Sequence, residues 1–385
     1  MEKETDVFVD SDSSKEAKLR KKESSTQTTA RHFREFNNNA PTFSVNGEDS
    51  LVEEPQESEI TYDTIEDEKT GQKYRVAILN KEALDRGDRP TILTLQFNTV
   101  VEHGPMNYFA EEISRGGRPV IILESPSVGK SSDMTSEQAH VLREDPKPFS
   151  EISESLLRAL NPLLKVNSGS DKQIDVAGYS QGAITALSIA EVASSLGIKV
   201  RKAFLLEIPG VKDFAKEGKF RKIKSSVNIM GAFTSEGANL PWYQKDPNDK
   251  RQREASGVEK PENPIKTYGK LAKDLAIKPM FRKGMFTAYP SAMSRKVVPN
   301  ILSSALEKQP DMKLVFVSGS DSNITPSGDI YDSIKADIDT GRIRRIVLPG
   351  DTHSVGERAK RMAYLFRRTM GDSKTSPANE IDSQN

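Results

Sequence analysis

Residues 174–182 read IDVAGYSQG, and this stretch decides the fold. The apolar run at its start predicts a buried strand, and the small apolar residues that recur at helical spacing after Ser180 predict a helix. Between them lies Gly-x-Ser-x-Gly. A serine on a sharp turn between a strand and a helix has its hydroxyl exposed, and glycines two residues to either side have no Cβ to clash in the turn. We therefore predict that Ser180 is a nucleophile on a strand–turn–helix elbow.

Strand patterns alternate with helix patterns on both sides of this elbow. Such alternation predicts a mostly parallel, doubly wound sheet covered by helices on both faces, which is the α/β class. Thr70-Gly71 is expected to close a hairpin at its start, and Ser150 is expected to be the N-cap of a helix. The predicted strands are 60–62, 74–79, 91–97, 119–124, 174–177, 202–208, 313–317 and 344–348, and the predicted helices include 105–115, 150–164 and 356–370.

Composition divides the 385 residues into segments of different character. The first sixty residues are polar and hold 14 acidic against 8 basic residues, which predicts a disordered acidic tail. The interval between the strands at 202–208 and 313–317 is too long for an ordinary loop and holds 20 basic against 10 acidic residues over 211–308, so we interpret it as an inserted, largely helical cap. The predicted divisions are a tail at 1–57, the core at 58–210 and 310–371, the cap at 211–309 and a second disordered tail at 372–385.

Composition also excludes several classes of site. The chain has no cysteine, which rules out disulfides, thiolate catalysis and cysteine metal sites. A formal net charge of zero argues against a dedicated nucleic-acid binder. Gly129-Lys130-Ser131 echoes the end of a P-loop, but position 124, where the first glycine would stand, is Glu124. We expect neither a cofactor nor a catalytic metal.

No apolar run in the sequence approaches the length of a membrane span. The N-terminus lacks the basic start and the apolar core of a signal peptide. These features predict a cytoplasmic protein that is not integral to a membrane.

A nucleophilic serine needs a general base, and the chain holds four histidines. His32 lies in the polar tail, and His103 and His140 precede the nucleophile. Only His353 follows the last predicted strand, as the order serine, acid, histidine requires in this arrangement. His353 is therefore the predicted base.

The base in turn needs a carboxylate to hold its tautomer. Asp321 follows the strand at 313–317, at the edge of the sheet where parallel strands place their sites. We predict Asp321 as this acid. Glu207, which ends the preceding strand, is the main alternative, and Asp329 and Asp351 are weaker ones.

The developing oxyanion needs two backbone donors. The N–H of Gln181, directly after the nucleophile, is predicted to be one. Asn98, in the turn after the strand at 91–97, is predicted to supply the other, with Phe97 as the second candidate.

Three stretches in this order resemble the α/β-hydrolase superfamily: GYSQG at 178–182, GSDSNITP at 319–326 and PGDTH at 349–353. Residues 125–133 are similar to the Gly-x-Gly-x-Ser-Asp stretch of its capped members. The resemblance covers about residues 60–370, and it implies an eight-stranded α/β-hydrolase fold, a Ser-Asp-His triad and a cap over the site. The chain departs from the family at Gln96-Phe97, where members often have His-Gly.

Taken together, the residues and the resemblance predict a serine hydrolase that cleaves an ester, thioester or related acyl bond of a small-molecule substrate through an acyl-enzyme on Ser180. Alternatives are an acyltransferase or a carbon–carbon bond hydrolase on the same fold, and a non-catalytic binding protein.

Overall fold

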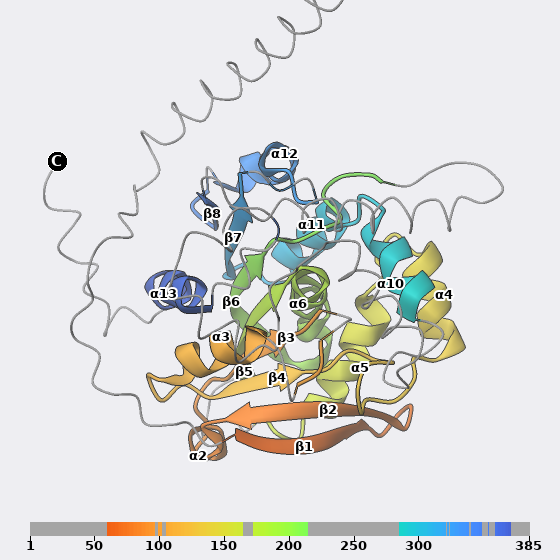
Figure 1. Ribbon diagram of the computed structural model, residues 1–385, viewed down its shortest axis with the longest axis vertical. Coiled ribbons are helices and arrows are strands. Elements are labelled where there is room, and N and C mark those ends of the chain that lie inside the picture. The colour runs from red at the N-terminus through yellow and green to blue at the C-terminus, as the bar shows by residue number, and fades with distance from the viewer. Residues whose placement is uncertain are drawn as a thin grey trace, which may run out of the picture. The chain divides into compact units, whose positions relative to one another are not determined.

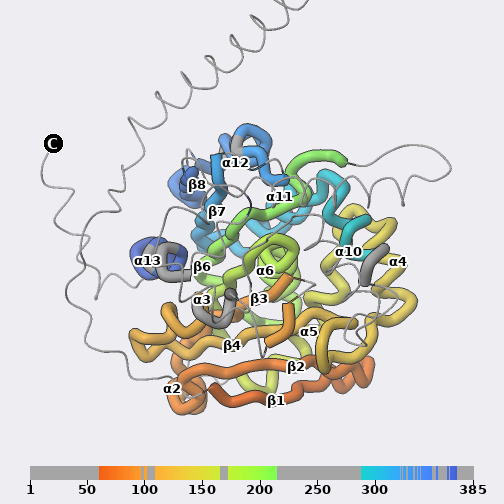
Figure 2. Tube along the Cα trace, in the orientation of Figure 1, coloured from red at the N-terminus to blue at the C-terminus, as the bar shows by residue number. Residues whose placement is uncertain are grey.

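The computed structural model in Figures 1 and 2 describes part of the chain, all of it within the compact unit Gln56–Asn385. The predicted tails and most of the predicted cap lie outside the described residues, so the predicted domain boundaries stay predictions. The described ranges are 60–96, 99–101, 105–164, 172–214, 285–320, 322, 324–338, 340–348, 353 and 359–370.

The centre of the fold is an eight-stranded sheet with strand order β1-β2-β4-β3-β5-β6-β7-β8. Only the β1–β2 and β2–β4 pairs are antiparallel, and every later pair is parallel. The predicted mostly parallel sheet is thus confirmed. The strands are β1 Ile60–Asp67, β2 Gln72–Leu79, β3 Thr91–Thr94, β4 Val120–Leu123, β5 Lys172–Tyr179, β6 Ile198–Leu206, β7 Lys313–Gly319 and β8 Ile343–Leu348.

Helices cover both faces of the sheet, as Figure 1 shows. On one face α3 (Pro105–Ser114) packs against α13 (Ala359–Met370), where the rings of Phe109, Phe204 and Phe366 meet. On the other face α6 packs against α5 and α11. The remaining helices are α2 Lys81–Asp85, α4 Ser136–Glu144, α5 Ser150–Leu160, α6 Gln181–Val192, η1 Ala193–Leu196, α10 Met285–Met293, α11 Val298–Lys308 and α12 Ser327–Ile338.

Two helices come from the last part of the range predicted as a cap. Helix α11 packs on α6, the helix that follows the nucleophile turn, and α10 packs on α4. Arg295, between them, donates from its guanidinium to the carbonyls of Leu142 and Asp145, at 2.6 and 2.7 Å. This part of the range is therefore anchored to one helix that precedes the nucleophile in the sequence, α4, and to one that follows it, α6.

The predicted role of Ser150 as an N-cap was wrong by one position. Phe149 is the N-cap of α5, and Ser150 is the first helical residue. The Ser150 hydroxyl donates to the carbonyl of Lys147 at 3.0 Å and to the carboxylate of Glu191 at 3.3 Å. The hydroxyl is thus engaged by partners outside its helix, and Glu191 lies too far along the chain for a local pattern to reveal it.

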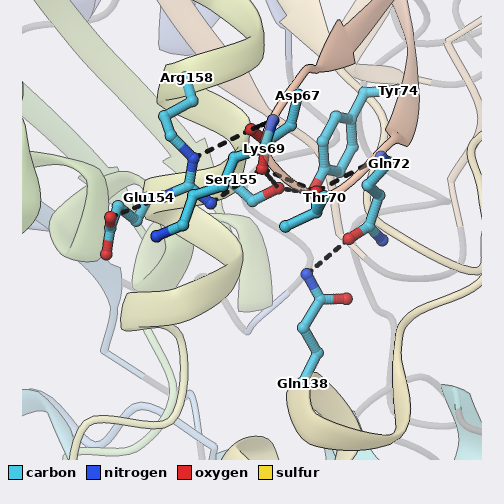
Figure 3. Close-up of polar contacts among 9 residues, drawn as sticks. All are labelled: Asp67, Lys69, Thr70, Gln72, Tyr74, Gln138, Glu154, Ser155 and Arg158. Carbon is cyan, nitrogen blue, oxygen red and sulfur yellow. Dashed lines mark hydrogen bonds and ion pairs between the residues drawn. The ribbon is translucent and has the colours of Figure 1, made fainter.

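A buried polar cluster ties the β1–β2 hairpin to α5 (Figure 3). Its centre is the carboxylate of Asp67, which is 1% exposed. Arg158 donates to it at 2.8 and 2.9 Å, Ser155 at 2.7 Å and Thr70 at 2.8 Å, and Tyr74 donates to Ser155 at 2.7 Å. Burial alone would raise the pKa of Asp67, but the hydrogen bonds from Arg158, Ser155 and Thr70 outweigh it and hold that pKa well below its ordinary value of 3.8.

Asp67→Asn is expected to lower the free energy of unfolding by about 3 kcal/mol at pH 7, because it removes one partner of a buried ion pair. The carboxylate has a lowered pKa in the folded chain, so its contribution is complete above pH 4 to 5 and is lost as the pH falls through the folded value. The difference between wild type and variant should therefore shrink from pH 5 to pH 2. Urea unfolding followed by circular dichroism measures it.

The matched control is Asp85→Asn, which removes a carboxylate that pairs with Lys81 at 3.0 Å on the surface, with 49% of its side chain exposed. A pair of this kind contributes less than about 1 kcal/mol. Equal losses in the two variants would contradict the importance of the buried cluster.

Candidate active site

Ser180 lies on a strained turn between β5 and α6. Its φ of 55° and ψ of −128° are unusual for a residue with a side chain. Its backbone N–H bonds the carbonyl of Leu206 on β6 at 2.9 Å, and its side chain does not cap α6. The hydroxyl is therefore held at the carboxyl edge of the sheet and is available to another partner.

The two glycines of the motif are required by close backbone contacts. A Cβ on Gly178 would lie 2.4 Å from the carbonyl oxygen of Gly182, and a Cβ on Gly182 would lie 2.2 Å from the carbonyl oxygen of Thr94. The Thr94 hydroxyl also donates to the Gly182 carbonyl at 2.5 Å. The first turn of α6 is thus pressed against the end of β3, which fixes where Ser180 stands.

His353 supplies the partner of the Ser180 hydroxyl. Its Nε2 lies 2.8 Å from Ser180 Oγ, and only 5% of the residue is exposed. This is the distance at which an imidazole can take a proton from a hydroxyl. The structure therefore brings together the predicted nucleophile and the predicted base, which lie 173 positions apart.

Glu207 is the carboxylate that contacts His353. Its Oε2 lies 3.2 Å from Nδ1 of the imidazole, and its side chain is fully buried. Glu207 directly follows β6, next to the strand that carries Ser180, and it too has a positive φ, of 48°. This backbone conformation is costly for a residue with a Cβ, and such residues concentrate at functional sites.

The Glu207 carboxylate also receives two donors, one from the last residue of the adjacent strand β7 and one from the segment after it. The backbone N–H of Gly319 bonds Oε1, and the hydroxyl of Thr325 bonds Oε2. The Thr325 hydroxyl in turn lies 2.9 Å from that of Ser322. These contacts fix the orientation of the carboxylate.

The position expected for an oxyanion is flanked by the start of α6 and the end of β3. Gln181 is the first residue of α6, and the first N–H groups of a helix have no carbonyl one turn back to bond. The turn after β3 is closed by the N–H of Thr99, which bonds the carbonyl of Gln96 at 3.1 Å. Asn98, predicted to supply the second donor, and Phe97, the other candidate for it, fall between these two residues in the sequence and lie outside the described residues.

The sequence matches no protein-family model and no curated protein. Solved structures are similar to it in fold. A bromoperoxidase from Bacillus anthracis has 13% identity and a TM-score of 0.50, over 81% of this chain and 100% of that one. An enol-lactonase from Burkholderia xenovorans LB400 has 12% identity and a TM-score of 0.50, over 81% and 100%. A carboxylesterase structure from Nitrososphaera gargenis has 14% identity and a TM-score of 0.50, over 80% and 97%.

The chain has the α/β-hydrolase fold. At these identities the likeness extends to the fold alone.

Asp321, the predicted acid, lies outside the described residues, and the described carboxylate at His353 is Glu207, the alternative that the sequence left open. The sequence analysis missed the supporting roles of Gly319 and Thr325. Their only signal was their place beside Asp321, in the segment that the resemblance singled out.

The echo of a P-loop at 129–131 has a different role in this α/β-hydrolase fold. The backbone N–H groups of Lys130 and Ser131 bond the buried carboxylate of Glu124, at 2.8 and 3.0 Å. The amides that would cradle a phosphate in a P-loop thus hold a carboxylate of the chain itself.

Within the described part of the chain, no group of three or more His, Asp or Glu side chains is arranged to hold a metal ion. Among the helices described there, none has both the length and the apolar character that a bilayer crossing requires.

Proposed function

We propose that Ser180, His353 and Glu207 form the catalytic triad of a serine hydrolase that cleaves an ester, thioester or related acyl bond of a small molecule. The proposal rests on one observation: a continuous chain of contacts, 2.8 Å and 3.2 Å long, from a hydroxyl on a strained elbow through an imidazole to a buried carboxylate. The imidazole can take the proton of the hydroxyl, and the carboxylate can accept a hydrogen bond from the other nitrogen of the imidazole. Glu207 therefore takes the role that the sequence analysis gave to Asp321.

In the proposed reaction His353 Nε2 takes the proton of the Ser180 hydroxyl as Oγ attacks the substrate carbonyl. Glu207 accepts a hydrogen bond from Nδ1–H and stabilises the imidazolium. The backbone N–H of Gln181 bonds the oxyanion of the tetrahedral intermediate, and the positive end of α6 favours the negative charge. The imidazolium then protonates the leaving group, and water attacks the acyl-enzyme with His353 again as the base.

The activities of proteins with a similar fold agree with an acyl bond as the target. These proteins include carboxylesterases from Nitrososphaera gargenis and an N-acyl homoserine lactone degrading enzyme. An ester and a lactone present the same reacting carbonyl, so the site described above would serve either.

An acyltransferase or a carbon–carbon bond hydrolase would use the same three side chains, and a non-catalytic protein could retain them. Product analysis separates these possibilities. Transfer of the acyl group to an added alcohol in preference to water would favour a transferase, and the absence of turnover by folded protein would favour a binding role.

Labelling with a fluorophosphonate followed by peptide mapping tests the proposal. We expect one adduct, on Ser180, that forms in the folded chain and is lost in urea, because the unfolded chain has no base at the serine. Ser180→Ala serves as the blank. An adduct on another residue, or equal labelling of the unfolded chain, would contradict the proposed triad.

Turnover of p-nitrophenyl esters of increasing acyl-chain length, on the same preparation, measures the substrate preference. We expect a maximum at one chain length, since a pocket of fixed size favours the acyl group that fills it.

A further inference from the structure

Tyr179, the residue before the nucleophile, contacts His353 twice. Its hydroxyl donates to the backbone carbonyl of His353 at 2.8 Å. Its ring stacks on the imidazole, with the centroids 5.6 Å apart and the planes inclined by 29°. Only 3% of Tyr179 is exposed. We propose that Tyr179 is a positioning residue that holds the His353 imidazole in line between Ser180 and Glu207, an inference that rests on the proposed triad.

These contacts restrain motions that the reacting groups leave open. Ser180 and Glu207 bond the two nitrogens at the edge of the imidazole, whereas Tyr179 contacts its face and its backbone. The torsion that turns a histidine ring about its Cβ–Cγ bond has a broad minimum. A ring packed against the face limits this rotation, and the hydrogen bond to the carbonyl fixes the backbone from which the side chain projects.

The position of Tyr179 in the sheet makes it suited to this role. It is the last residue of β5 and pairs with Leu206, the last residue of β6. Ser180 directly follows β5, and Glu207 directly follows β6. Tyr179 therefore lies on the pair of strands whose ends carry both partners of His353. Its contacts hold His353, which comes after β8 in the sequence, in a fixed position relative to those strands.

The stacked ring of Tyr179 also favours the positive charge that develops on His353 during the proposed reaction. An imidazolium forms when His353 takes the proton from Ser180. The face of a tyrosine ring attracts a cation within about 6 Å of its centroid, and the imidazole lies at 5.6 Å. The contact should therefore strengthen when the histidine becomes charged.

Tyr179→Phe and Tyr179→Leu test the two contacts separately. The phenylalanine variant keeps the ring and loses the hydrogen bond, and we expect kcat to fall about 3- to 30-fold with KM within about twofold of wild type. The leucine variant loses both contacts, and we expect a fall of about 100-fold, the effect of a misplacement of about 1 Å. Steady-state kinetics on a p-nitrophenyl ester and the rate of fluorophosphonate labelling should change in parallel.

Tyr74→Phe is the matched control. Tyr74 is also fully buried, and its hydroxyl bonds Ser155 at 2.7 Å in the cluster of Figure 3, outside the site. Removing either hydroxyl leaves a buried partner without its donor and should cost a similar free energy of unfolding, about 1–3 kcal/mol. Urea unfolding establishes that match, and Tyr74→Phe should keep wild-type kcat and labelling rate.

A readout independent of turnover separates this inference from the proposed function. The chain has four histidines, so ¹⁵N-histidine NMR resolves the His353 imidazole against three internal references. We expect the His353 signals to shift in Tyr179→Phe while those of His32, His103 and His140 stay in place. If the wild-type chain does not react with the fluorophosphonate but the His353 signals still shift in Tyr179→Phe, the result would support the positioning role and contradict the hydrolase.

Two results would overturn the proposal. One is wild-type kcat, labelling rate and His353 signals in both Tyr179 variants. The other is a loss of kcat in Tyr74→Phe as large as that in Tyr179→Phe, because the effect would then follow from lowered stability.

Discussion

Glu207→Gln is expected to lower kcat for ester hydrolysis by about 10³- to 10⁴-fold, with KM changed by less than about threefold. The amide keeps the size of the side chain, but it carries no charge to balance the imidazolium and can present N–H donors that favour the wrong tautomer of His353. The same loss should appear in the rate of fluorophosphonate labelling of Ser180, because nucleophilic attack is the step that needs the base. Kinetics and labelling are measured on protein shown to be folded by circular dichroism.

Asp321→Asn is the discriminating variant for this prediction, since both residues follow neighbouring strands of the sheet. If Glu207 is the acid, kcat of Asp321→Asn should stay within about threefold of wild type. A loss of 10³-fold in Asp321→Asn together with a small loss in Glu207→Gln would return the acid role to Asp321.

Gly182→Ala is expected to lower the free energy of unfolding by more than about 3 kcal/mol, and to remove activity in what remains folded. The new Cβ would lie 2.2 Å from the carbonyl oxygen of Thr94 and 2.9 Å from its carbonyl carbon. Both are backbone atoms inside the sheet, so neither can turn aside as a side chain could. Either α6 or β3 must move, and the elbow at Ser180 moves with them.

Gly328→Ala is the matched control for this substitution. Gly328 lies in the first turn of α12, and a Cβ there would meet nothing within 4 Å. Alanine has the higher helix propensity, so this variant should be unchanged or slightly more stable, by up to about 1 kcal/mol. Urea unfolding of both variants makes the comparison, and equal stabilities would contradict the close approach of α6 to β3.

Most of the sheet could be predicted because its strands carry local signals. Apolar runs such as residues 119–124 need burial on both faces, and this requirement alone predicts central parallel strands. The elbow was recognisable because its motif is local, and the steric need at Gly178, where a Cβ would meet the carbonyl of Gly182, lies within the motif itself. His353 followed from chain order, since the other histidines precede the nucleophile.

The choice of acid could not be read from the same signals. Asp321 and Glu207 each follow a strand that ends at the same edge of the sheet, and both are carboxylates. The geometry at His353 depends on the positive φ of Glu207 and on donors from Gly319 and Thr325. Those donors come from more than a hundred positions away, and no periodicity encodes such a contact.

The separation of His353 from its partners sets an order for the maturation of the site. Ser180 and Glu207 follow adjacent strands, but His353 comes 146 positions after Glu207. At about 5–20 residues per second, a ribosome needs roughly 7–30 s to add that stretch. During this time the nascent chain carries a serine hydroxyl without a base, and such a hydroxyl is a weak nucleophile. The proposed triad is therefore incomplete while this stretch is being synthesised, and it is completed only when the segment that carries His353 reaches Ser180 and Glu207.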